Sequence, residues 1–133
     1  MEQTPKDRDK KTILVVDDDE DILKAISGFL SADYNVLRAK SGADALQQSK
    51  DSKSEISLLL SDFQMPGMTG MELASEITAQ RPKIKVLLMS GYPAGTLVLN
   101  EGWHFLSKPF VQSQLLALVV GLVNPGKATR FSA

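Results

Sequence analysis

The chain has 133 residues and a formal net charge of -1 at neutral pH, with 43% hydrophobic and 23% charged residues. This length suits one domain with a proper core and is short for two. Because the net charge is near zero, no broad positive field exists to hold nucleic acid or an anionic membrane surface. The composition therefore predicts a soluble globular domain that binds neither nucleic acid nor membrane.

Cysteine is absent from the chain, which excludes disulfides, thiolate metal sites and cysteine nucleophiles and is typical of a reducing compartment. Residues 1–11 are polar and of mixed charge, without the apolar run of a signal peptide. No stretch approaches the ~20 apolar residues that a membrane helix needs. We therefore expect a cytoplasmic protein with an N-terminal tail over 1–11, one domain over 12–124 and a C-terminal tail over 125–133.

Apolar, β-branched runs alternate with stretches of helical periodicity along the chain. Runs that are apolar at every position predict strands covered on both faces, and such strands occur in parallel sheets. We expect strands at 12–16, 34–39, 56–61, 84–89 and 103–107, and helices at 21–30, 41–50, 71–80 and 111–123. Strands that alternate with helices predict βαβ units with right-handed crossovers and a mostly parallel sheet.

Two details of this pattern concern helices. Asp19 and Ser41 stand where a side-chain oxygen can cap the first and second helices. Between the last two strands, Pro93, Gly95 and Gly102 interrupt the expected fourth helix. They leave room for only about two turns at 3.6 residues per turn, so we expect this helix to be short or irregular.

Polar side chains follow four of the predicted strands at the point where each strand ends. Asp17 and Asp18 follow the first strand, Asp62 the third, Ser90 the fourth and Lys108 the fifth. In open parallel sheets, ligands bind beyond the carboxyl ends of the strands. We therefore expect three carboxylates, one hydroxyl and one ammonium to converge on a single edge of the sheet.

Such a group of carboxylates favours a bound cation. Two unit charges about 4 Å apart interact by roughly 4 kcal/mol at an effective dielectric of 20, so the acids raise one another's pKa values unless a cation joins them. Oxygen ligands without His or Cys indicate Mg²⁺ that keeps several waters and takes phosphate oxygens as further ligands. A carboxylate nucleophile beside a metal and a lysine predicts phosphoryl transfer that ends in an aspartyl phosphate.

The segments ILVVDDDEDIL, SDFQMPGMTG, LLMSGYP and FLSKPF, in that order, resemble the response-regulator receiver family of two-component phosphorelay systems. The similarity covers Thr12 to about Val123, and residues 62–70 match the family's Asp-x-x-Met-Pro-x-Met-x-Gly stretch at every defining position. The resemblance implies a flavodoxin-like, doubly wound α/β fold with a five-stranded parallel sheet of order 2-1-3-4-5.

The resemblance also implies a role for each residue at the acidic edge. Asp62 would be the phosphoacceptor and would share the Mg²⁺ ion with Asp18, which binds directly, and with Asp17, which binds through water. The backbone carbonyl of Gln64 would be a further ligand. Lys108 would pair with a phosphoryl oxygen. The phosphoryl donor would be the phosphohistidine of a histidine kinase or of a phosphotransfer protein.

The same resemblance implies a switch that reports phosphorylation to a partner. Ser90 would move towards the phosphoryl group, and Phe105 would follow it inward. Gly91 would leave the mouth of the site open, and the Lys108–Pro109 peptide would be cis. The domain would be a signalling receiver, a monomer or weak dimer, that catalyses only its own phosphorylation and slow dephosphorylation.

Three other functions share part of the pattern. An aspartate-nucleophile phosphatase also uses Asp and Mg²⁺, but it needs a second carboxylate two residues after the nucleophile, where this chain has Gln64. A receiver that served only as an interaction module would lack the acceptor, an acid pair or the lysine, and this chain has all of them. A flavodoxin would need a hydroxyl- and glycine-rich phosphate loop, and none follows residues 12–16.

Taken one at a time, the motifs have ordinary structural explanations. An acidic run after a strand is often a helix cap, the role that we assign to Asp19. His104, the only histidine, falls in a predicted strand and not in the helical setting of a kinase histidine. The context of the domain stays open between a free-standing regulator and the receiver of a hybrid histidine kinase. The sequence of residues 89–110 favours the receiver of a hybrid kinase. The sequence does not indicate the downstream target.

Overall fold

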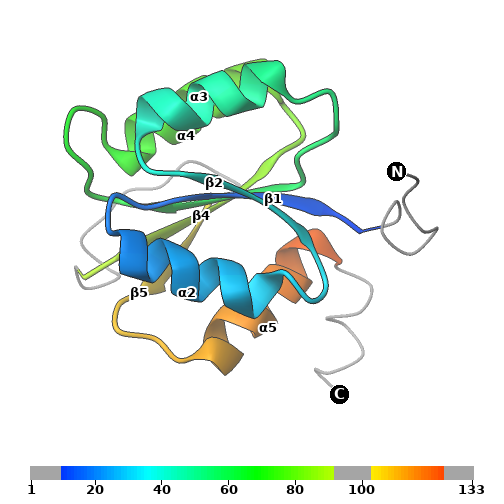
Figure 1. Cartoon of the computed structure of the whole chain (residues 1–133), viewed down its shortest axis with the longest axis vertical. Coiled ribbons are helices and arrows are strands. Elements are labelled where there is room, and N and C mark those ends of the chain that lie inside the picture. The colour runs from blue at the N-terminus through cyan, green and yellow to red at the C-terminus, as the bar shows by residue number, and fades with distance from the viewer. Residues whose placement is uncertain (1–9, 92–102, 125–133) are drawn as a thin grey trace.

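The computed structural model describes residues 10–91 and 103–124 (Figure 1). The strands are β1 (Thr12–Val16), β2 (Asn35–Ala39), β3 (Leu58–Asp62), β4 (Lys85–Ser90) and β5 (Trp103–Ser107). The helices are α2 (Glu20–Leu30), α3 (Gly42–Asp51), α4 (Gly70–Gln80) and α5 (Gln112–Val123). Each of these elements lies where the sequence predicts it, with ends shifted by at most two residues. Apart from Gly91, the segment from Gly91 to Gly102 in which a short fourth helix is expected lies outside the described residues. So do residues 1–9 of the N-terminal tail and the whole C-terminal tail.

All five strands join one parallel sheet with the order β2-β1-β3-β4-β5, which confirms the predicted topology. Helices α3 and α4 cover one face of the sheet, and α2 and α5 cover the other (Figure 1). Helices on both faces make the architecture doubly wound. In such a sheet the carboxyl ends of all strands point to the same edge, which is where ligands bind.

Strand side chains alternate between two separate cores, because successive residues of a strand point to opposite faces. The core under α2 and α5 includes Ile13, Val15, Leu58, Leu60, Leu87, Met89, Leu115 and Val119. The core under α3 and α4 includes Leu14, Val16, Leu59, Leu73, Ile77, Val86 and Leu88. This arrangement explains why the strands read as continuous apolar runs. Within the described ranges, no helix combines the length and the apolar character needed to cross a bilayer.

Helix caps fix the chain directly behind the carboxyl ends of β1 and β3. The Asp19 carboxylate accepts hydrogen bonds from the backbone N–H groups of Asp21 and Ile22 at 2.9 and 3.2 Å, so the predicted cap is confirmed. At the start of α4, Thr69 and Glu72 form a reciprocal capping box with bonds of 2.9 and 3.1 Å. Each cap satisfies N–H groups that would otherwise lack partners. The caps thereby fix the ends of the loops that follow β1 and β3.

Candidate functional site

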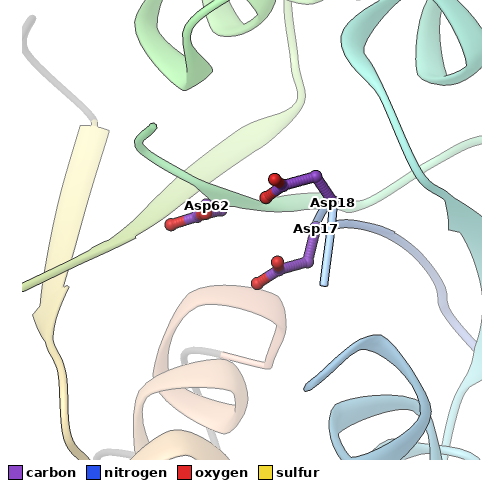
Figure 2. A group of neighbouring side chains, drawn as sticks. All are labelled: Asp17, Asp18 and Asp62. Carbon is purple, nitrogen blue, oxygen red and sulfur yellow. The ribbon is translucent and has the colours of Figure 1, made fainter. Parts of the chain in front are cut away.

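Three carboxylates meet at the carboxyl edge of the sheet. Asp17 and Asp18 follow β1, and Asp62 is the last residue of β3, the strand that pairs with β1. Figure 2 shows Asp17 and Asp18 reaching from the end of β1 towards Asp62. One carboxylate oxygen from each of the three lies within 4.8 Å of the others. We call these three residues the acidic cluster.

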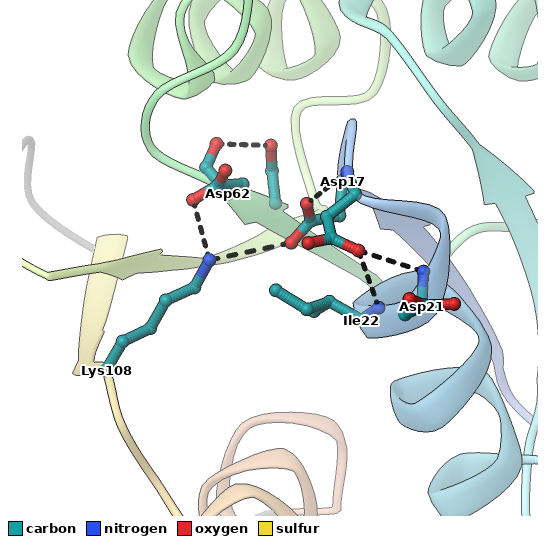
Figure 3. Close-up of polar contacts among 7 residues, drawn as sticks. Asp17, Asp21, Ile22, Asp62 and Lys108 are labelled. Atoms are coloured by element: carbon teal, nitrogen blue, oxygen red, sulfur yellow. Dashed lines mark hydrogen bonds and ion pairs between the residues drawn. The ribbon is translucent and has the colours of Figure 1, made fainter.

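Lys108 reaches the acidic cluster from the loop after β5. Its ammonium nitrogen lies 3.1 Å from Asp62 Oδ1 and 3.6 Å from Asp17 Oδ2 (Figure 3). The backbone N–H of Lys108 donates to the Ser90 carbonyl at 2.7 Å, which anchors the start of this loop to the end of β4. The Lys108–Pro109 peptide is cis, as the family resemblance implies. A single ammonium therefore faces three carboxylates.

Asp17 is the most constrained acid of the cluster, because only 1% of it is exposed. Its Oδ1 atom accepts a hydrogen bond from the Asp19 N–H at 2.9 Å. Its Oδ2 atom is buried and accepts no hydrogen bond from any described residue. Burial raises the pKa of Asp17, the negative charges of Asp62 and Asp18 raise it further, and the Asp19 N–H and Lys108 offset only part of this rise.

These features fit a small divalent cation. The donors are all carboxylate oxygens, as hard cations prefer, and the buried Asp17 Oδ2 atom accepts no hydrogen bond from the described residues. Exposure increases across the cluster, from buried Asp17 through partly buried Asp62 to exposed Asp18. One side of the site is therefore open to water and to an incoming group. Gln64 lies in the loop two residues beyond Asp62.

The two residues of the predicted switch lie near the same edge. Ser90 ends β4 with 3% of its surface exposed, and it pairs in register with Ser107. Phe105 is half-buried in β5 and packs against the core under α3 and α4. Strand alternation puts both side chains on that same face of the sheet.

Gly70 supports the end of β3 through a contact that the sequence analysis did not identify. It is the first residue of α4, and its N–H donates to the Phe63 carbonyl at 2.8 Å. A Cβ atom added there would lie 2.3 Å from the Asp62 carbonyl oxygen and 3.0 Å from the Phe63 Cα. Only glycine permits this approach of α4 to the backbone of Asp62. The motif contained the signal, but the contact exists only in the folded chain.

Comparisons with known proteins agree with this geometry. The chain matches the response regulator receiver domain family over residues 13–120. It is 33% identical over 113 residues to sensor kinase CckA of Brucella abortus, covering 81% of this chain but 12% of that protein. It is 34% identical over 105 residues to the response regulator receiver protein CpdR of the same organism, covering 75% of this chain and 86% of that protein.

Solved structures show the same fold. A response regulator receiver domain protein from Clostridium thermocellum has a TM-score of 0.78 at 28% identity, over 88% of this chain and 97% of that one. The receiver domain of the hybrid histidine kinase CckA has a TM-score of 0.74 at 31% identity, over 85% and 99%. The chain therefore belongs to the response regulator receiver domain family. It is a signalling module with an acidic pocket typical of phosphoacceptor receivers.

The buried charge of Asp17 generates a prediction about pH and stability. The pKa of Asp17 in the folded chain lies above its ordinary value of 3.8, so the charge of Asp17 destabilises the fold. This loss of stability is complete at pH values above the folded-state pKa and disappears as the pH falls towards 3.8. In EDTA at pH 7, Asp17→Asn should therefore raise the free energy of unfolding by about 1 kcal/mol. Urea denaturation across pH measures it, and the gain should shrink on acidification.

The matched control for this change is Asp33→Asn, because Asp33 is an exposed acid outside the cluster. It should leave the pH profile of stability unchanged. If Asp17→Asn is less stable than the wild type at pH 7, or if its advantage is the same at every pH, the electrostatic account of Asp17 is wrong.

The close approach of Gly70 generates a second prediction. Gly70→Ala should lower the free energy of unfolding by about 1–3 kcal/mol, the usual cost of overpacking, because the new methyl group meets rigid backbone. It should also slow phosphorylation by displacing Asp62. Gly28→Ala is the control: its added Cβ meets nothing within 4 Å, so it should stabilise α2 by up to about 1 kcal/mol. Equal stability of the two variants would contradict this role.

Proposed function

We propose that Asp62 accepts a phosphoryl group from the phosphohistidine of a partner histidine kinase or phosphotransfer protein, with Mg²⁺ held by the acidic cluster. A receiver domain implies a cognate histidine kinase. The observation that carries the proposal is the contact of the Lys108 ammonium with Asp62 at 3.1 Å, beside two further carboxylates. This arrangement concentrates a nucleophile, a counter-ion and a cation site within a few ångströms.

The chemistry follows from these positions. A carboxylate oxygen of Asp62 attacks phosphorus, the phosphorus–nitrogen bond of the donor breaks, and the imidazole leaves with the bonding electron pair. The product is an acyl phosphate on Asp62. A Mg²⁺ ion held by the acidic cluster would supply positive charge to the phosphoryl oxygens. The Lys108 ammonium moves from the Asp62 carboxylate to a phosphoryl oxygen. It therefore balances negative charge both before and after phosphorylation.

Each acid has a distinct part in this proposal. Asp18 is exposed and would bind the cation directly, whereas Asp17 is buried and would hold it through a water. The backbone carbonyl of Gln64 adds a further oxygen from the loop after β3. Few protein ligands and several retained waters are the usual coordination of Mg²⁺.

We further propose that Ser90 and Phe105 convert the modification into a change of surface. Ser90 would donate its hydroxyl to a phosphoryl oxygen, and Phe105 would move inward from its half-buried position. Such a local charge event can reorder a neighbouring segment and change which partner binds. The chain spans 12% of CckA and 86% of CpdR, so its relatives include both a large kinase and a compact receiver. In either setting the signal would pass by protein contact.

The acceptor assignment predicts where phosphate is found. Incubation with acetyl phosphate and Mg²⁺ should add one phosphoryl group to the wild type and none to Asp62→Asn, because the amide is not a nucleophile of this kind. Intact-mass spectrometry reads the result, and base should release the group. Asp33→Asn should be modified like the wild type. Modification of Asp62→Asn to the wild-type extent would show that another residue is the acceptor.

The metal assignment predicts a shift in thermal stability. At ten times the dissociation constant, Mg²⁺ should stabilise the fold by about 1.4 kcal/mol, because it binds the folded state alone. Thermal unfolding should show a rise of several degrees in Tm. Asp18→Ala should abolish this rise and Asp17→Ala should weaken it, whereas Asp33→Ala should retain it. The site is disproved if both cluster variants respond to Mg²⁺ like the wild type.

A further inference from the structure

A second surface feature lies at the opposite edge of the sheet from the acidic cluster. It is a hollow of about 620 Å³ between the chain entering β3, the turn from α4 to β4, and the end of α5. Figure 1 shows the last turn of α5 on the side where β1 begins. The four steps along β3 from Leu58 to Asp62 separate the two edges by about 13 Å, at ~3.3 Å per residue.

The rim of this hollow is basic. Lys53, Lys83 and Lys85 line it and are exposed, and Glu55 is the one acidic residue in its lining. In the described part of the chain, no carboxylate forms an ion pair with any of the three lysines. Their positive charge is therefore available to a partner. We call this feature the basic hollow.

The basic hollow is poorly suited to a small anion such as free phosphate. The guanidinium of Arg81, the fourth cation in the lining, already donates to the carbonyls of Ser49, Ser52 and Ser54 at 2.8–3.0 Å. Backbone N–H groups in the lining are also committed, since Ile84 donates to Arg81 and Lys85 donates to Ser57. The charge comes from flexible lysines at the rim and not from donors that converge on one point.

The interior of the basic hollow is apolar instead. Its lining includes exposed Pro82, the buried side chains of Ile56 and Ile84, and the partly buried side chains of Leu122 and Val123. Helix α5, which supplies the last two, has no charged residue from Gln112 to Val123. The volume lies within the range of about 300–1,000 Å³ that is typical of binding pockets. An apolar side chain with acidic neighbours matches this lining.

We propose that the basic hollow binds an acidic, extended segment of a partner protein. One apolar side chain of that segment would enter the hollow, and its flanking carboxylates would pair with Lys53, Lys83 and Lys85. The surface is separate from the acidic cluster, so the segment and a phosphoryl group can be bound at the same time. The proposal does not depend on the chemistry of Asp62.

The test uses a fluorescent synthetic peptide of alternating Glu and Ser with one central Leu. Anisotropy should show binding at low ionic strength that weakens as salt is added. Lys83→Glu/Lys85→Glu should raise the dissociation constant about tenfold. The matched control, Lys24→Glu/Arg38→Glu, makes the same change in net charge on α2 and β2 and should have little effect. Ser in place of the peptide's Leu should also weaken binding several-fold.

Other outcomes overturn the proposal. Equal losses of peptide affinity in the two double variants would show that the net charge of the domain, and no particular site, binds the peptide. Unchanged affinity in Lys83→Glu/Lys85→Glu would show that the rim lysines do not bind it. A single-stranded oligonucleotide of equal charge that binds more tightly would make nucleic acid the partner. Circular dichroism and thermal unfolding of each variant check that it is folded. If the variant does not fold, amide shifts in the wild type decide: the peptide must perturb Ile84 and Val123 and not Asp62.

Discussion

The repulsion among three carboxylates at one edge of the sheet is the constraint on which this domain depends. Parallel strands force their carboxyl ends together, so Asp17, Asp18 and Asp62 cannot separate without breaking the sheet. Lys108 neutralises part of the charge but contacts only two of them, at 3.1 and 3.6 Å. The unfolded chain would relieve the repulsion, so the cluster costs stability. Because the repulsion destabilises the folded state, a bound cation or an added phosphoryl group changes the stability of the fold.

Rigid backbone keeps this unfavourable arrangement in place. The caps at Asp19 and Thr69 begin α2 and α4 immediately behind the acids, and Gly70 lets α4 press against the Asp62 carbonyl. Both cores beneath the edge are built mainly from buried apolar side chains, so the strands cannot shift in register without exposing them. The acids are therefore preorganised, and binding a cation requires little rearrangement of the chain.

The sequence predicts the order of elements well, because buried strands and capped helices leave local signals. It predicts strand ends less well. Tyr34 and Ile56 are apolar and buried, and the sequence places them in strands, yet both lie outside β2 and β3. Tyr34 donates its N–H to Leu30 in the turn after α2. Burial alone therefore does not identify residues of the sheet. The burial of Asp17 depends on distant residues, so no local pattern predicts it. Gly70 belongs to the motif over 62–70, but its contact with the Asp62 backbone forms only when that loop folds.

The overall charge of the chain conceals a strong separation of charge. A net value of -1 excludes a broad field of either sign, but it is a sum over two unlike edges. The carboxyl ends of the strands carry the acidic cluster, and the amino ends of β3 and β4 carry Lys53, Lys83 and Lys85. Since screening limits exposed charges to about 8 Å at physiological salt, a partner close to one edge is affected mainly by that edge. Partner chemistry in such a domain follows from local charge, which composition cannot reveal.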